Sequence, residues 1–156
     1  MKSIGVIISI ILFSCSAYQK AEHSEQSNLI KLIKSRCRGK CPVYELNINS
    51  EGEAIYHGIA NVRNKGIFKF KLTHRELVEL ENQFEDLKFH EIKIQQKTKY
   101  RDVAYTTVKY QGTSHSYRSS WERSPLKSIV EKLDELIQEN TNILIINYIT
   151  NPYQHL

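Results

Sequence analysis

The feature that most restricts the fold of this chain is the change in the period of its apolar residues. Residues 43–49 alternate, with Tyr44, Leu46 and Ile48 on one side and mostly polar residues on the other. Such alternation is typical of a β-strand with one buried face. Turn residues at 50–52 then favour a hairpin. The same reasoning predicts further strands at 29–37, 54–58, 66–72, 102–111 and 112–118.

Two other segments have the apolar spacing of amphipathic helices. Thr73 and Glu76 form a capping box, and the apolar positions that follow are Leu77, Leu80, Phe84 and Leu87. Ser124 and Pro125 are suited to begin a second helix, whose apolar stripe is Leu126, Ile129, Val130, Leu133, Leu136 and Ile137. We expect an α+β fold, an antiparallel sheet of hairpins with two helices packed on one face. Residues 141–156 are expected to form an apolar C-terminal strand or flap.

The N-terminus has the layout of a bacterial secretion signal, a positive charge followed by a short apolar run at 4–13. A membrane-spanning helix needs about 20 apolar residues, so this run is a poor anchor by itself. The run ends in Leu12-Phe13-Ser14-Cys15, which resembles a lipobox. We expect lipid on Cys15, although a plain signal peptide with a chance cysteine stays open. The expected organisation is a lipoprotein signal peptide at 1–14, a lipidated cysteine and polar tether at 15–28, and a single α+β domain at 29–140.

The formal net charge of +5 is spread along the chain, and its densest group lies at residues 31–40. A nucleic-acid-binding protein would be expected to show a stronger basic stripe, often with a recognisable motif. We therefore expect no nucleic-acid partner. A solvated basic face is the simplest interpretation, with anionic lipid headgroups as a minor alternative.

Cys37 and Cys41 are separated by a segment that contains Gly39 and are followed by Pro42. Glycine permits a tight turn, and proline favours an extended residue before it. In an exported protein such a pair is expected to form a disulfide. A metal site would need two further ligands, and a thiol oxidoreductase favours Cys-x-x-Cys at a helix N-terminus. Both alternatives stay open.

The segment Cys37-Arg38-Gly39-Lys40-Cys41-Pro42-Val43-Tyr44 resembles domain of unknown function family 6438, which is frequent in bacterial lipoproteins. The resemblance covers about residues 29–137 and implies an exported setting and a fold of hairpins and two helices. It implies no activity. Glu51-Gly52 stands where Asp-Gly is usual. The matching positions are Cys37, Gly39, Cys41, Pro42, Tyr44, Gly52, Tyr56, Gly58, Gly66 and Asp102.

No nucleophile with a base, carboxylate pair or metal cluster is recognisable, so we expect no catalytic residues, metal or cofactor. The candidates for a ligand or partner surface are Tyr100, Arg101 and Asp102 at the start of a strand and Trp121 before the second helix. Asp102 more often bonds local backbone, and Trp121 more often covers a sheet edge. The first hypothesis is a membrane-tethered, non-enzymatic binding or structural module of the cell envelope, periplasmic or surface-exposed, whose partner is an envelope protein or a small ligand. The alternative is a thiol-redox or metal-dependent envelope protein that uses the cysteine pair.

Overall fold

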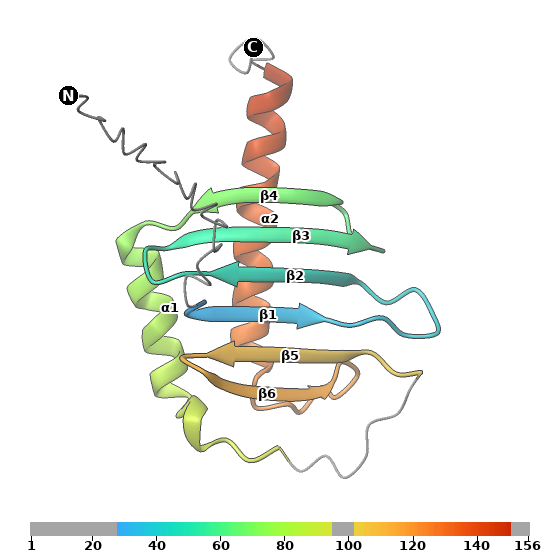
Figure 1. Cartoon of the computed structure of the whole chain (residues 1–156), viewed down its shortest axis with the longest axis vertical. Helices are drawn as coiled ribbons and strands as arrows, with labels where there is room; N and C mark the ends of the chain where they lie inside the picture. The colour runs from blue at the N-terminus through green and yellow to red at the C-terminus, as the bar shows by residue number, and fades with distance from the viewer. Residues whose placement is uncertain (1–27, 95–101, 151–156) are drawn as a thin grey trace, which may run out of the picture.

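The domain is a single antiparallel sheet with a layer of helices (Figure 1). The computed structural model describes residues 28–94 and 102–150, with only the backbone of residues 146–150. The strand order is β4-β3-β2-β1-β5-β6, and each neighbouring pair is antiparallel. The predicted α+β class is confirmed. In chain order the elements are β1 (Ile30–Lys34), β2 (Val43–Ile48), β3 (Glu53–Ala60), β4 (Gly66–Lys71), α1 (His74–Asp86), the 3-10 helix η1 (Phe89–Glu91), β5 (Tyr105–Tyr110), β6 (Thr113–Arg118) and α2 (Lys127–Thr150).

The strand register arranges the helix-covered face of the sheet in rows. Residues directly opposite each other on neighbouring strands point to the same face, and so do alternate residues along a strand. The two inner rows of the central strands are apolar and are centred on Ile30 and Leu32 of β1, both fully buried. The row at the other end of β1 is polar. Its members are Lys34, Tyr44, Thr106 and Tyr117.

Both helices pack on this face and share one core with the sheet. Phe84 of α1 stacks on Tyr110 of β5, with ring centroids 4.3 Å apart. α2 crosses the strands behind the sheet in the view of Figure 1, and its buried Ile129 and Leu133 belong to the same apolar cluster as Phe84. The other face of the sheet carries the alternate, more polar residues of each strand, as expected for an antiparallel sheet with one solvated side.

The helix caps and the turn glycine that the sequence indicates are present at the starts of both helices and in the first hairpin turn. The Thr73 side chain accepts a hydrogen bond from the Glu76 backbone N–H, and the Glu76 carboxylate accepts one from the Thr73 N–H, so the capping box is present. The Leu126 N–H donates to the Ser124 hydroxyl at 3.2 Å, just before α2. Gly52 has a φ of 77°, a conformation that favours glycine. The strands predicted at 29–37 and 102–111 are shorter than expected.

The predicted strand or flap at 141–156 is wrong as far as Thr150, because α2 continues to that residue without a break. No glycine or proline lies between Lys127 and Thr150 to end the helix. An isoleucine-rich run cannot be assigned to strand or helix from its periodicity alone. Residues 151–156 lie outside the described part of the chain. Within the described residues, no helix is long and apolar enough to cross a membrane.

Candidate functional site

The polar row of the sheet meets α2 at a cluster of three side chains. The Lys34 ammonium forms an ion pair with the Asp134 carboxylate, with 2.7 Å between Nζ and Oδ2. The Tyr44 hydroxyl donates a hydrogen bond to the other oxygen of the same carboxylate. Lys34 Nζ also lies 5.2 Å from the centroid of the Tyr44 ring. One helix residue is therefore bonded to two neighbouring strands at the end of the core.

The sequence places these residues together for simple geometric reasons. Lys34 is the last residue of β1, two residues beyond buried Leu32, and it pairs directly with Tyr44 in β2. Asp134 follows Val130 by four residues and precedes Ile137 by three, and both of those residues are buried. Residues at these spacings lie on one side of a helix, so the carboxylate points toward the sheet.

Burial and the nearby carboxylate keep Tyr44 protonated. Burial raises the pKa of the Tyr44 hydroxyl far above its usual value, and the charge of Asp134 and the hydrogen bond to it raise that pKa further. Burial also raises the pKa of Tyr117 in the same row. The ion pair itself is partly solvated, because the side chains of Lys34 and Asp134 are 17% and 28% exposed.

Two hollows lie on either side of this cluster, and together they form what we call the Lys34 cleft. Lys34, Pro42 and Asp134 line both hollows. The Tyr56 hollow has a volume of about 280 Å³, and its further walls include Tyr44, Tyr56, Asn64, Ile137 and Thr141. The Trp121 hollow has a volume of about 370 Å³, and its further walls include Thr106, Tyr117, Ser119, Trp121 and Val130.

The β3–β4 loop completes the wall of the Tyr56 hollow. The Tyr56 hydroxyl donates to the Asn64 carbonyl at 3.2 Å, and the Asn64 side-chain amide donates to the Thr141 hydroxyl at 2.7 Å. Gly58 permits this approach, because a Cβ atom there would collide with the Asn64 carbonyl oxygen. The loop is thus held between the sheet and α2.

The cysteine loop forms the rim of the cleft. Cys37 and Cys41 are joined by a disulfide with their Cα atoms 5.9 Å apart, and Cys41 borders the Trp121 hollow. The Arg38 N–H donates to the Asp102 carbonyl at 3.4 Å, and the Asn61 side chain donates to the Cys41 carbonyl at 3.0 Å. These contacts fix the loop to the segments on both sides of it. The residue after Cys41, Pro42, leads into β2 rather than a helix.

A family model described as a domain of unknown function (DUF6438) matches residues 28–140, which run from the start of β1 into α2. The chain belongs to the DUF6438 family. A search of curated proteins finds no relative of this chain. Because the function of the DUF6438 family is unknown, the geometry of the cleft has to carry any functional argument.

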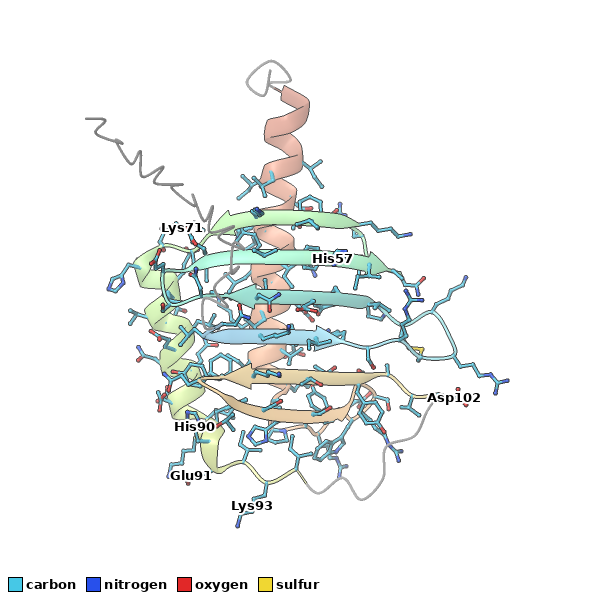
Figure 2. The ribbon with its side chains drawn as sticks, viewed as in Figure 1. His57, Lys71, His90, Glu91, Lys93 and Asp102 are labelled. Atoms are coloured by element: carbon cyan, nitrogen blue, oxygen red, sulfur yellow. A yellow bond between two sulfur atoms is a disulfide. The ribbon has the colours of Figure 1, made fainter. Side chains whose placement is uncertain are left out.

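The DUF6438 domain brings together only part of the predicted site. Trp121 stands at the rim of the cleft, is 39% exposed, and packs on Tyr117 with the ring centroids 6.2 Å apart. Asp102 lies at the end of the sheet that carries the cysteine loop, away from His90 (Figure 2). Its side chain is exposed, and its backbone carbonyl makes the contact with the loop. Tyr100, Arg101 and Cys15 lie outside the described residues.

Sequence reasoning missed the centre of the cleft in this DUF6438 domain. Asp134 interrupts the apolar stripe of α2 at a position that faces the sheet, and that interruption was the signal available. Lys34 carried no such signal, because it is one of several basic residues between positions 31 and 40 and nothing in the sequence distinguishes it from the others. Among residues 28–94 and 102–150, no group of three or more histidine, cysteine or acidic side chains is arranged to hold a metal ion.

Proposed function

We propose that this DUF6438 protein is a lipid-anchored, non-enzymatic binding module of the cell envelope, and that its ligand binds in the Lys34 cleft. The observation that carries the proposal is the pair of hollows around a fixed Lys34–Asp134–Tyr44 cluster. Ligand sites are typically concave, with apolar walls and a few polar groups in fixed positions. The cleft has this composition, and the disulfide loop at its rim is held on both sides.

The electrostatics of the cluster support binding rather than catalysis. A general base must reach the proton that it abstracts and have a pKa near the operating pH. The raised pKa of Tyr44 disfavours its anion. The Asp134 carboxylate holds Lys34 and Tyr44, one on each oxygen, and each oxygen keeps a lone pair that can accept a hydrogen bond from a ligand. The adjacent opposite charges of Lys34 and Asp134 suit a small ligand that has both donors and acceptors and little net charge, such as a disaccharide or a zwitterionic dipeptide.

Trp121 offers a direct test, because it is the only tryptophan in the chain and borders the cleft. The full-length protein is titrated with a panel of disaccharides and zwitterionic dipeptides while Trp121 emission is recorded. A member of the panel should give a saturable change. Asp134→Asn, which removes the charge but keeps an acceptor, should weaken that binding about tenfold or more, since hydrogen bonds to charged groups contribute about 1.5–3 kcal/mol. No change with any member, or equal binding by the variant, would contradict binding at this cluster.

The redox alternative is tested with the same preparation. Loop geometry favours a structural role for the disulfide, because a strand, β2, follows the pair in place of the helix N-terminus that would stabilise a thiolate. Thiol labelling of the native protein should detect no free thiol at Cys37 or Cys41 until strong reductant is added. Free thiols at both positions, or a stoichiometric metal, would instead favour the redox or metal hypothesis.

A further inference from the structure

Large apolar side chains remain exposed on the side of the sheet where β4 lies. Ile55 on β3 is 42% exposed, Ile67 on β4 is 65% exposed, and Ile143 on α2 is 55% exposed. Ile55 and Ile67 lie on the open face, since both are at the exposed alternate positions of their strands. Among the described strands, β4 is the last on this side and pairs with β3 alone.

α2 extends the molecule beyond this edge (Figure 1). The hydrogen bond between Thr141 and Asn64 marks where the helix passes the start of β4. From there α2 continues to Thr150, which at a rise of about 1.5 Å per residue adds about 13 Å of helix. Neighbouring strands lie about 4.8 Å apart, so this length of helix is about as long as three further strands would be wide. The continuing segment includes Ile143, Leu144 and Ile145, so the part of α2 that projects past β4, on the helix-covered side of the sheet, is rich in apolar residues.

The charge at this edge is mainly positive, and the exposed acid within it is Glu53 of β3, which lies opposite Lys71. Lys65, Lys69 and Lys71 are all exposed, and no aspartate or glutamate occurs between residues 54 and 75. The ion pairs found among the described residues involve none of these three lysines. Lys69 pairs directly with Ile55 across the strands, so cationic and apolar side chains alternate on the surface.

We propose that this β4 edge surface, made up of Ile55, Ile67, Ile143, Lys65, Lys69 and Lys71, docks on an anionic lipid bilayer. The isoleucines enter the interfacial region, and the lysine ammoniums remain among the headgroups while their alkyl stems follow the apolar atoms. The outward backbone groups of β4 bond headgroups and water. Figure 2 shows Lys71 at one end of β4, so the charges are distributed along the strand.

The same lysines argue against a second copy of the chain as the occupant. An unpaired edge strand can pair with its own copy, and exposed lysines are a common feature that prevents this. Pairing two β4 strands would bring two sets of three lysines together, with one nearby acid in each copy, Glu53, to compensate them. An anionic bilayer supplies that compensation, and each lysine near such a surface strengthens binding about fivefold.

The inference goes beyond the proposed anchor and does not depend on it, because the surface would bind an anionic bilayer with or without lipid on Cys15. The full-length protein is incorporated into vesicles of phosphatidylcholine, alone or with about 30% phosphatidylglycerol to supply the negative surface potential. Amide hydrogen exchange of β4 is then measured by mass spectrometry. We expect at least about tenfold slower exchange of its outward amides in the anionic vesicles, and loss of this protection near 1 M salt, where the Debye length is about 3 Å.

The variant Lys65→Glu/Lys69→Glu/Lys71→Glu should lose the protection, since three lysines together account for roughly 100-fold in binding. Its control makes the same change in charge at exposed positions elsewhere, Lys40→Glu/Lys93→Glu/Lys109→Glu. The control should keep the protection.

Three outcomes would overturn the docking proposal. They are equal β4 exchange in both kinds of vesicle, equal loss of protection in variant and control, and protection in zwitterionic vesicles that grows with the number of protein copies, which would indicate self-association. A failure of the proposed lipid anchor is detected by a separate measurement. An intact mass without lipid on Cys15 would refute the anchoring, and the exchange measurement would then be made with protein added from solution.

Discussion

Removal of the Asp134 carboxylate is the sharpest test of the cluster at the centre of the cleft. Asp134→Ala loses the ion pair with Lys34 and the hydrogen bond from Tyr44. Removing one partner of a fully buried ion pair costs about 3–5 kcal/mol, whereas an exposed pair contributes about 0–1 kcal/mol. Because the two side chains are 17% and 28% exposed, water can partly solvate Lys34 in the variant. We therefore expect the free energy of unfolding to fall by about 2 kcal/mol.

A double-mutant cycle isolates the interaction from the loss of packing. The cycle measures Lys34→Met, Asp134→Leu and the double variant, in which both charges are replaced with apolar side chains; such paired replacements are often neutral or stabilising. We expect the double variant to cost clearly less than the sum of the two single variants, so that the two changes are non-additive. Tyr44 then faces an apolar neighbour and loses one bond.

The measurement is equilibrium unfolding in urea, followed by the emission of Trp121, which packs on Tyr117 in the same hollow. The matched control is Glu131→Ala, one turn earlier on α2. Glu131 pairs with Lys127 at 3.8 Å, and both side chains are more than half exposed. The control should change stability by less than about 0.5 kcal/mol. If Asp134→Ala is equally mild, or the cycle is additive, the cluster does not join the sheet to α2 as argued.

Four further predictions concern the anchor, the core, the disulfide and alkaline stability. Cys15→Ala should block processing or release the protein from the membrane fraction, and unchanged metabolic labelling with a radioactive fatty acid would refute the lipoprotein assignment. Leu133→Ala should lower the free energy of unfolding by about 2–5 kcal/mol, because Leu133 is fully buried; a change below about 0.5 kcal/mol in urea unfolding would mean this face is not core. Cys37→Ala/Cys41→Ala should fold with a loss near 2 kcal/mol, the loop-entropy value for so short a loop, and circular dichroism of an unfolded chain would contradict this. The pKa of Tyr44 is raised in the folded state, so its contribution to stability is complete below about pH 10, the ordinary tyrosine value, and is lost as the pH rises further; Tyr44→Phe should make stability fall less steeply above pH 10, and an unchanged alkaline slope would count against its burial.

The sheet and the starts of the helices followed from local signals that each have one physical meaning. Alternation placed Tyr44, Leu46 and Ile48 on one face, and all three are buried. The capping box at Thr73 has one stable geometry, and the helix begins there. The order of the strands did not follow, because β1 lies between β2 and β5, which are distant in sequence. Such pairing depends on the packing of the whole core rather than on any one segment.

The end of α2 and the cleft escaped prediction for related reasons. After Thr141 the isoleucines have neither the period of a strand nor that of a one-sided helix, so only the absence of a helix breaker separated the two. The cleft forms where Asp134, on the sheet-facing side of α2, meets Lys34 at the end of β1. The position of Asp134 on the helix is enough to identify it as unusual, because a carboxylate on an apolar face needs a partner. The identity of that partner depends on how the helix crosses the sheet, and five strands separate Lys34 from Asp134 in the sequence. A lone acid in an apolar stripe is thus a signal of a partner whose identity only the tertiary structure supplies.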